Sequence, residues 1–501
     1  MEGNKLKNIE AIIKKEIAES EYYSQIEVLV DMISGRNLYL SGPAGSGKSY
    51  VIRKFVDYMI KNAPSYEIAL TAPQGTAAVN INGRTIHSFT GMGVSQLDFE
   101  DRGGVSKYAE KQMKKTDILV IDEVSMLSAW QLRFILEAFK FYKRNRWHNT
   151  QVIVSGDFTQ LPPVAKTTDP AEMAQLCYGS ASWREFNFKN TYMDRVYRAE
   201  DEKLKNLLNK IALGEGEPSD LEGIKVIDNT DGLSAPILVS TNKVADRINK
   251  ENHDANISFN EKTFYLDIRK DKGTKYEDAS RLFARQSSMD KPVEVKTNDV
   301  VMITVNENRF NSYCKHLNKN APYLQNGMIG NVSEIVDNED IGIVFEYKDP
   351  DTEKVYRYLI ERKCVFEQTV IKTDKQGKKY EEVVASFSQV PFKLAYAISI
   401  HKSQGQTYSH VVADLSNCWL ENLGYVALSR AKSINGLYLL NNNGKILGNK
   451  SLKVNKESVA IKKEVFKDSY IGSKEERFEI LMKKIKDNNI VVEDLLDIDE
   501  W

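Results

Sequence analysis

The eight residues from 42 to 49 have the types and the spacing that hold a polyphosphate. Two glycines stand five positions apart and are followed by Lys48 and Ser49. Glycines let backbone N–H groups curl around phosphate oxygens, Lys48 neutralises the outer phosphates, and Ser49 can hold Mg²⁺. A glycine-rich turn that ends in Lys-Ser by chance is the alternative. The residues that we predict to bind a nucleoside triphosphate are Gly42, Pro43, Ala44, Gly45, Ser46, Gly47, Lys48 and Ser49.

Two carboxylates and an amide further along the chain have the types that triphosphate hydrolysis requires. Asp122 and Glu123 follow an apolar run, and Gln160 follows another. Adjacent carboxylates at the end of a buried strand are costly unless a cation is present. Asp122 is therefore suited to the Mg²⁺ shell, and Glu123 to accepting a proton from the attacking water. Gln160 is suited to sensing the γ-phosphate or orienting that water, and an incidental acidic turn is the alternative for the carboxylates.

The elements around these residues are those of a mostly parallel α/β sheet. An apolar run at 37–40 precedes the phosphate loop, and apolar residues recur at helical spacing over 51–59 after it. Further apolar runs at 68–70, 118–121 and 152–154 have the length of buried strands. We therefore expect an α/β fold with the candidate residues at the ends of its strands.

A second group of candidates follows the run at 68–70. Small and hydroxyl side chains after a strand suit a backbone that approaches the phosphates of another polymer, which makes Thr71, Pro73 and Gly75 candidate contacts. His87 and Phe89 come next in the chain. They are ordinary packing residues or, beside such a phosphate track, Phe89 stacks on a base.

Composition is that of an ordinary soluble protein with more than one core. The 501 residues include 69 Lys and Arg against 70 Asp and Glu, so any basic track must be local. Four cysteines are far apart and form neither a metal pattern nor a disulfide framework. Residues 1–20 predict an amphipathic helix and not a signal peptide, and no apolar run is long enough to span a membrane. We expect a cytoplasmic protein of a bacterial or phage-infected cell, with no membrane partner.

Eight runs together resemble the motifs of superfamily 1 helicases. They are residues 42–49, 71–89, 122–127, 156–163, 196–198, 237–242, 397–407 and 425–431. The chain is most similar to the Pif-type group, with the phage Dda and bacterial RecD helicases as relatives, over about residues 20–440. The resemblance implies an ATP- and Mg²⁺-dependent DNA helicase. It would move 5′ to 3′ on single-stranded DNA and unwind forked DNA in replication, recombination or repair.

The resemblance also implies roles for residues whose function their chemistry alone does not determine. Gln25 lies on the helix before the first strand, where a solvated position is the alternative, and matches the adenine-reading glutamine of the family. Arg198 and Arg430 match two arginines that reach the γ-phosphate. The remaining matches are Gln404 and Gly405 for the nucleotide, and Thr241, Asn242, His401 and Ser403 for DNA.

The expected architecture is two RecA-like domains with an ATP cleft between them. Residues 1–190 form the first, with a small insert at about 91–115, and residues 191–292 with 391–450 form the second. Short β-rich runs at 293–390 predict a β insert, which the resemblance makes an SH3-like barrel. Residues 372–379 predict a solvated hairpin tip, with a DNA-contacting loop as the alternative.

The tail at 451–501 is helical and then acidic. Its interleaved acidic and apolar residues would suit docking to a protein partner, while folding back on its own domain or disorder is favoured. Two other functions stay open. One is a single-strand translocase, or a motor subunit of a nuclease complex, that does not unwind alone. The other is a nucleotide-dependent switch, against which the full hydrolytic set of residues argues.

Overall fold

The chain forms two compact units. The first unit comprises Met1–Ile224, Cys418–Asn435 and Gly448–Trp501, and the second unit comprises Lys225–Asn417 and Gly436–Leu447. The computed structural model describes residues 2–74, 77–78, 81, 83–92, 99, 105–163, 171–195, 201–230, 235–265, 267–270, 292–305, 307, 313–324, 327–337, 341–349, 353–361, 363–373, 379–469 and 472–495.

The first unit is built on a six-stranded parallel sheet, which contains the four strands that the apolar runs predict. Its strand order is β3-β2-β4-β5-β1-β6. The strands are β1 (Leu38–Ser41), β2 (Ile68–Ala72), β3 (Arg84–Thr85), β4 (Ile118–Ile121), β5 (Gln151–Gly156) and β6 (Lys189–Tyr192). Because β4, β5 and β1 are neighbours, the loops that follow them meet at one edge of the sheet.

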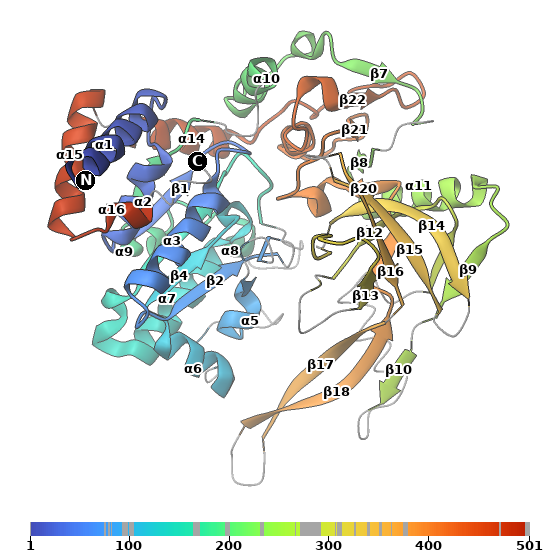
Figure 1. Ribbon diagram of the computed structural model, residues 1–501, viewed down its shortest axis with the longest axis horizontal. Coiled ribbons are helices and arrows are strands. Elements are labelled where there is room, and N and C mark those ends of the chain that lie inside the picture. Colours follow the sequence, from blue (N-terminus) through green and yellow to red (C-terminus); the bar gives the residue numbers. More distant parts are fainter. Residues whose placement is uncertain are drawn as a thin grey trace. The chain divides into compact units, whose positions relative to one another are not determined.

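Helices bury both faces of this sheet, which explains why a central strand such as β4 is apolar along its whole length. Along β4, Ile118 and Val120 join one core cluster, and Leu119 and Ile121 join the other. The first cluster also contains side chains of α1 (Glu2–Ala18), α2 (Gln25–Ile33), α3 (Lys48–Asn62), α15 (Lys474–Asp487) and α16 (Val492–Leu495). The second contains side chains of α5 (Ile86–Thr90), α6 (Lys107–Lys115), α7 (Ala129–Lys143), α9 (Ala181–Phe186) and α14 (Lys456–Asp468) (Figure 1).

Two further segments of the first unit differ from the predicted division. Residues 191–224 and 418–435 were expected in the second domain, whereas they belong to the first unit. Ile434 N–H donates to the Asp201 carboxylate (2.6 Å), which ties the two segments to each other. They contain α10 (Glu202–Ala212), the 3₁₀ turn η3 (Pro218–Leu221) and α13 (Leu423–Leu428); the remaining short elements of the unit are α8 (Ala171–Ala174), η1 (Val124–Met126) and η2 (Arg144–Asn149).

The second unit has its own parallel sheet, in the order β20-β8-β21-β22-β7. The strands are β7 (Lys225–Ile227), β8 (Ile237–Val239), β20 (Ala397–Ser399), β21 (Val411–Ala413) and β22 (Leu437–Leu440). Helix α11 (Asn242–Ala255) packs on it, because Asn249 exchanges two hydrogen bonds with the backbone of Ala397. The 3₁₀ turn η4 (Ile400–Ser403) follows β20, and η5 (Ile434–Gly436) leads from the first unit into β22.

The block predicted to be β-rich is an antiparallel sheet, of order β13-β16-β15-β14-β12-β19. Its strands are β12 (Val300–Ile303), β13 (Cys314–His316), β14 (Ile329–Asp337), β15 (Ile341–Lys348), β16 (Val355–Ile360) and β19 (Phe392–Leu394). A pair of strands, β9 (Glu261–Phe264) and β11 (Val293–Lys296), precedes it, so β structure begins before residue 293. The SH3-like character of this block stays a prediction.

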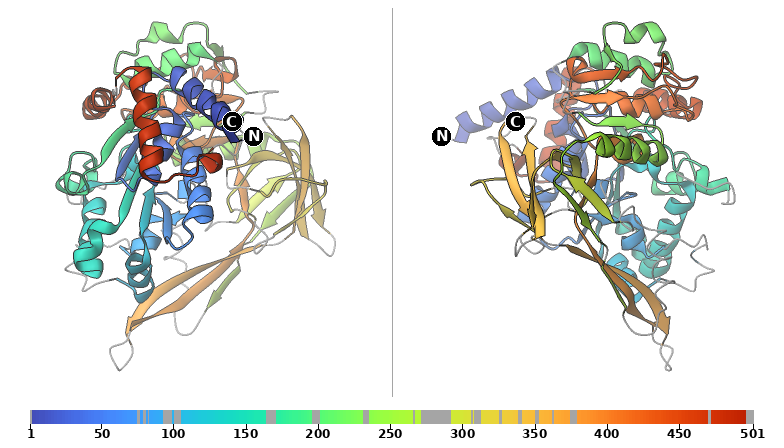
Figure 2. Two further views of the ribbon diagram at one scale, coloured as in Figure 1. Left: turned by 60° about the vertical axis from the view of Figure 1, so that its left-hand side comes forward. Right: turned by 90° about the vertical axis from the view of Figure 1, so that its right-hand side faces the viewer.

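A long hairpin extends from the antiparallel sheet. It consists of β17 (Cys364–Thr373) and β18 (Lys379–Gln389), and β10 (Asp267–Lys270) pairs with residues 385–388 of β18 (Figures 1 and 2). The hairpin predicted around 372–379 is therefore confirmed, although residues 374–378 lie outside the described part of the chain.

The tail folds back on the first unit as far as residue 495. Arg477 of α15 is buried, and its guanidinium contacts both carboxylate oxygens of Glu27 on α2 (2.6 and 3.0 Å) and the carbonyl of Ser20 (2.8 Å). Leu495 is buried in the same core cluster. Among the described helices, none is both long and apolar enough to cross a membrane.

The Arg477→Met substitution should make the first unit less stable to unfolding, because the Glu27 carboxylate would stay buried without its cation. Breaking a buried pair from one side costs about 3–5 kcal/mol of the free energy of unfolding. Urea denaturation followed by tryptophan fluorescence measures the loss. Lys483→Met on the exposed side of the same helix is the control. Equal stability of the two variants would mean that the ion pair between Arg477 and Glu27 does not stabilise the first unit.

Candidate functional site

The loop from β1 to α3 forms a narrow backbone cradle. A Cβ atom on Gly42 would lie 2.6 Å from both the Met193 carbonyl oxygen and Ser46 Oγ, so only glycine fits there. Gly45 and Gly47 have φ angles of 84° and 85°, in the left-handed region that glycine adopts without strain. The buried Ser46 hydroxyl has no hydrogen-bond partner among the described residues. The cradle is therefore shaped to receive an external hydrogen-bonding group.

Lys48 begins α3 and folds back over this cradle. Its ammonium donates to the carbonyl oxygens of Gly42 (2.7 Å) and Pro43 (2.9 Å). Burial lowers the Lys48 pKa, and the carboxylates of Asp157, Glu123 and Asp122 act in the opposite direction. The ammonium thus lies where a polyphosphate could replace the two carbonyls as its partner.

Two oxygen ligands suited to Mg²⁺ meet beside the loop. Ser49 Oγ donates to Asp122 Oδ2 (3.1 Å), and Asp122 Oδ1 accepts the Glu123 N–H (3.0 Å). Hydroxyl and carboxylate oxygens next to phosphate groups are the ligands that Mg²⁺ uses in such sites. The residues present therefore fit the predicted metal.

Glu123 occupies a constrained turn directly after β4. Its φ angle is 53°, in a region that is unusual for residues other than glycine. A Cβ atom on Gly156, at the end of the neighbouring β5, would lie 2.9 Å from Val124 N, so the two strand ends approach closely. Such outliers persist where the surroundings hold the backbone in place, and they occur often at functional sites.

A hydrogen-bonded connection joins the end of β5 to α13. Asn422 Nδ2 donates to the Gln160 carbonyl oxygen (2.7 Å), and Tyr425 OH donates to Asp157 Oδ2 (2.8 Å). The side-chain oxygen of Gln160 is buried and has no hydrogen-bond partner within the described residues. The predicted Gln160 is therefore held close to Asp157.

Arg430 follows α13 in the first unit and not, as expected, in the second. Its guanidinium is buried and donates to the Val426 carbonyl (3.0 Å) and to Ser429 Oγ (2.8 Å). The structure thus brings Arg430 into the unit that carries the phosphate loop. Arg198 and Gly75 lie outside the described residues.

Gln25 lies beside the phosphate loop. It is buried at the start of α2, and its Nε2 donates to the Ser46 carbonyl oxygen (3.4 Å). Ser24 and Glu27 form a reciprocal cap that fixes this end of the helix. A solvated helix position, the alternative weighed from the sequence, is therefore wrong.

Two candidate DNA contacts of the first unit have buried side chains: Phe89 is the packing residue that the sequence left as an alternative, whereas an approach of the backbone at Thr71 to DNA stays a prediction. Phe89 is fully buried in the sheet's core and is unavailable for stacking on a base. Thr71 is also buried, and its hydroxyl donates to the Val120 carbonyl (2.7 Å). In contrast, His87 is exposed, with Nε2 3.4 Å from Gln131 Nε2, and Pro73 is half-buried.

The predicted residues of the second unit gather around the start of α11 and around η4. Thr241 caps α11 by accepting the Val244 N–H (3.3 Å), and the exposed Asn242 accepts from Ser399 Oγ (2.8 Å). Ser403 is buried and donates to the Ile400 carbonyl (2.8 Å), so its hydroxyl is directed inward. Three further members of the group follow: His401, whose pKa is lowered by burial; Gln404, which is buried; and Gly405, which has a φ angle of 79°.

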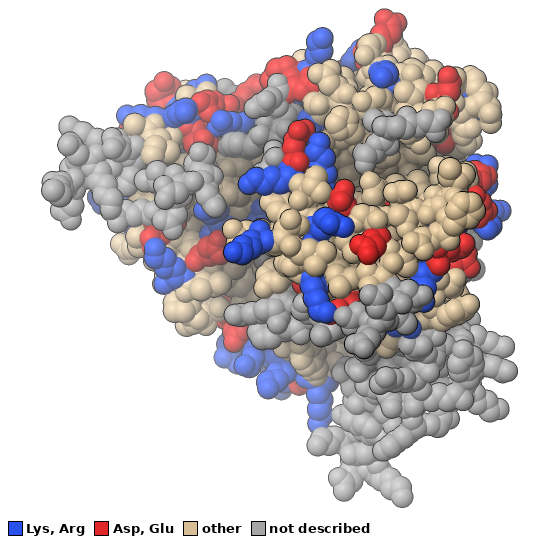
Figure 3. Space-filling model, turned by 45° about the vertical axis from the view of Figure 1, so that its right-hand side comes forward, with Lys and Arg blue, Asp and Glu red and all other residues tan. Residues whose placement is uncertain are grey.

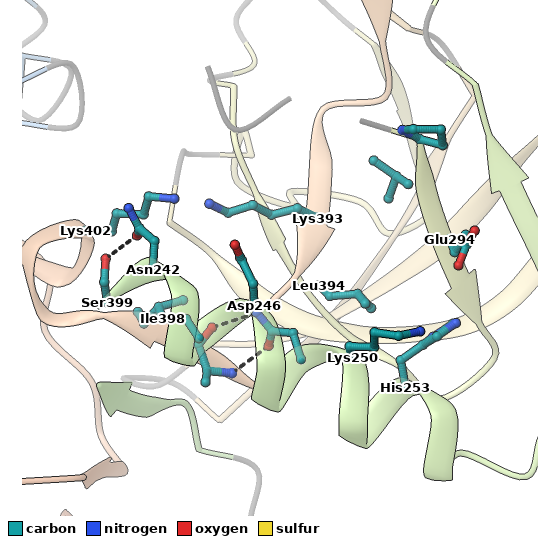
Figure 4. A pocket seen from close by; sticks show the side chains of 15 residues that line it. Asn242, Asp246, Lys250, His253, Glu294, Lys393, Leu394, Ile398, Ser399 and Lys402 are labelled. Carbon is teal, nitrogen blue, oxygen red and sulfur yellow. Dashed lines mark hydrogen bonds between the residues drawn. The ribbon is translucent and has the colours of Figure 1, made fainter. Parts of the chain in front are cut away.

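A pocket of about 420 Å³ lies beside these residues (Figure 4). Lys393 and Lys402 extend their ammonium groups toward each other over Asn242 (Figure 4). Burial and the neighbouring Lys402 lower the Lys393 pKa to about 7, against an opposing effect of Asp246. Two cations that repel each other would gain from an anion between them. The sequence reasoning missed both lysines, although Lys402 lies within the run at 397–407.

Charged side chains of both signs are mixed on the surface. On the face shown in Figure 3, Lys and Arg side chains lie among Asp and Glu side chains. This mixture accords with the net charge of −1. A contact with a polyanion would therefore depend on local groups of basic side chains.

Comparison with known proteins gives consistent matches. Residues 16–217 match the family model described as PIF1-like helicase, and residues 394–437 match that of the UvrD-like helicase C-terminal domain. The ATP-dependent DNA helicase Pif1 of Psychrobacter is 30% identical over 82% of this chain and 66% of its own length. The chain spans 46% and 60% of two further relatives, from Trypanosoma brucei and Emericella nidulans.

Solved structures confirm the α/β fold with parallel sheets. The crystal structure of Pif1 helicase from Candida albicans has a TM-score of 0.72 at 25% identity, and the match covers 88% of this chain and 98% of that one. A Bacteroides Pif1 helicase in complex with ADP-AlF3 and single-stranded DNA has a TM-score of 0.65 at 21% identity, over 90% and 99% of the two chains.

Gln25→Ala should weaken the preference for ATP over CTP by about tenfold, because the variant loses a paired donor and acceptor beside the loop. Competition between the two nucleotides for binding measures the preference. The triphosphate itself should still bind, since Lys48 and the cradle are unchanged. An unaltered preference would rule out base reading by Gln25.

Proposed function

The chain belongs to the PIF1-like helicase family, and from this premise we propose that it is an ATP-dependent DNA helicase. It moves 5′ to 3′ along single-stranded DNA and unwinds forked duplexes in replication, recombination or repair. The polarity and the processes come from the family resemblance. We place its work in the cytoplasm of a bacterial or phage-infected cell, and the acidic end of its tail is the segment offered to a protein partner.

The observation that carries this proposal is the contact between Ser49 and Asp122 beside the phosphate cradle. Bound Mg²⁺ would neutralise phosphate charge there. Lys48 would exchange its two loop carbonyls for the outer phosphates, and Gln25 would meet the base. Glu123 would accept the proton of the attacking water, and Gln160 would orient that water. The cradle, the Mg²⁺ ligands and the base thus serve one reaction, hydrolysis of ATP.

Coupling of hydrolysis to movement requires contacts that differ between the ATP and ADP states. Arg430 and Arg198 are the residues proposed to gain the γ-phosphate as a partner and to lose it on hydrolysis. The basic pair Lys393 and Lys402 in the second unit is proposed to hold a DNA phosphate. The Bacteroides relative whose structure holds both a nucleotide analogue and single-stranded DNA supports this combination of ligands.

The proposed function predicts unwinding of a duplex with a 5′ single-stranded tail and none with only a 3′ tail. Strand separation is measured with fluorescently labelled oligonucleotides, ATP and Mg²⁺. Glu123→Gln is the matched control, since it keeps the size and hydrogen bonding of the side chain but removes the base. The control should bind ATP and fail to unwind.

Other outcomes of this experiment separate the alternatives. ATP turnover stimulated by single-stranded DNA, without strand separation on either substrate, would favour a translocase or a motor subunit. A Glu123→Gln variant that still unwinds would contradict the assignment of the base. Nucleotide binding with no turnover under any condition would favour a switch.

The β17–β18 hairpin is proposed to act mechanically during unwinding. Beyond the pair Thr369↔Val383, the strands of the hairpin pair with each other and with no other strand among the described residues, and none of the predicted nucleotide ligands lies within it. Opening a base-pair step costs roughly 1.4 kcal/mol of stacking. A motor that does not support the DNA where the two strands separate therefore slips back along its strand more readily.

Replacing residues 370–382 by a two-residue Asn-Gly turn should shorten the hairpin and keep its pairing with β10. ATP turnover stimulated by single-stranded DNA should persist, whereas strand separation should fall sharply. Steady-state hydrolysis and unwinding are measured on the same preparation. Equal loss of both activities would mean that the hairpin is structural, and unchanged unwinding would place the brace elsewhere.

A further inference from the structure

Lys462 of α14 is a buried cation that the proposed function does not use. Its side chain is 6% exposed, and its ammonium has no hydrogen-bond partner in the described part of the chain. The nitrogen lies 5.6 Å from the ring centre of Tyr192 and 5.5 Å from that of Phe466. Aromatic faces stabilise a cation only in part, and a buried ammonium without a counter-charge is costly.

The position of α14 puts this cation next to the start of the phosphate loop. Tyr192 ends β6 and pairs with Ser41, the residue that precedes Gly42. The carbonyl oxygen of the next residue, Met193, is the group that a Cβ atom on Gly42 would strike. Lys462 therefore reaches the nucleotide site from a helix more than 400 positions further along the chain.

A buried carboxylate, Asp157, lies at the same edge of the sheet: Ser41 pairs with Tyr192 on one side and with Gly156, the residue before Asp157, on the other. Asp157 Oδ1 accepts the N–H (3.0 Å) and the hydroxyl (2.6 Å) of Thr159, and Oδ2 accepts Tyr425 OH (2.8 Å). Burial acts to raise the Asp157 pKa, but Lys462, Lys48 and the Thr159 hydrogen bonds outweigh it, so the pKa is lowered. Two lysines thus share one carboxylate.

We propose that Lys462 is a positioning residue of the nucleotide site: it remains as a positive charge beside the buried Asp157 carboxylate when Lys48 turns from the loop carbonyls to the phosphates of ATP. This inference rests on the proposed function, because it requires a nucleotide to draw Lys48 away. Asp157 in turn holds Tyr425 and so keeps α13 and Gln160 in place. The C-terminal helix thereby becomes part of the ATPase.

The physical reason is the cost of a buried charge that loses its partner. Without Lys462, movement of Lys48 toward the phosphates would leave Asp157 buried with only neutral hydrogen-bond donors. Removing one partner of a buried pair costs far more than removing both, since the remaining charge is uncompensated. This cost would make the binding of ATP less favourable, and the KM for ATP would rise.

The test is the steady-state ATPase activity of the full chain with single-stranded DNA. Lys462→Met should raise the KM for ATP by roughly tenfold or more, with a far smaller change in kcat. Lys462→Arg, which keeps the charge, should restore much of the affinity. The control is Lys463→Met, at the exposed neighbouring position of α14, which should leave both constants unchanged.

A double variant keeps the test decisive if Lys462→Met does not fold. Asp157→Asn leaves Lys462 without its counter-charge, whereas Asp157→Asn with Lys462→Met removes both charges. The double variant should therefore bind ATP more tightly than Asp157→Asn alone. No such rescue, or the same KM for Lys462→Met as for Lys463→Met, would overturn the role of Lys462. Neither result would affect the proposed function, which fails instead if Lys48→Ala retains ATP hydrolysis.

Discussion

Charge buried at the carboxyl edge of the first sheet is the constraint on which the site depends. The neighbouring order of β4, β5 and β1 brings Asp122, Asp157 and the phosphate loop to one edge, where helices on both faces exclude water. A carboxylate in such a place is tolerated only with cations and hydrogen-bond donors around it. Lys48, the Tyr425 hydroxyl and Lys462 meet this need in the free protein, and a nucleotide with Mg²⁺ would redistribute the same charges.

The C-terminal tail supplies cations for buried carboxylates and also packs on the core of the first unit. α14 supplies Lys462 beside the sheet, and α15 supplies Arg477, which neutralises Glu27 on the helix that carries Gln25. Two helices of the tail therefore lie beside elements that flank the loop between β1 and α3. Of the two outcomes that the sequence favours for this tail, folding back on its own domain and disorder, the structure shows the first as far as residue 495.

The sequence predicts what local spacing determines. The strand, loop and helix around Lys48, and the carboxylates after β4, follow from residue types that are close along the chain. It does not predict which face a side chain takes at a strand or helix end, so the sequence leaves Phe89 open between packing and stacking on a base, and the structure buries it. Nor does it predict partners that only folding brings together. Lys462 stands in a helix of mixed charge, Lys393 in a short strand, and the segment of Arg430 joins the first unit through Asp157 and Asp201.

This arrangement of charges is proposed to hydrolyse ATP in response to DNA. The steady-state rate of ATP hydrolysis by the unaltered chain with Mg²⁺, measured without and with saturating single-stranded DNA, tests this proposal directly. We expect hydrolysis that requires Mg²⁺ and accelerates clearly when the DNA is added. Tight nucleotide binding with no turnover in either condition would contradict it.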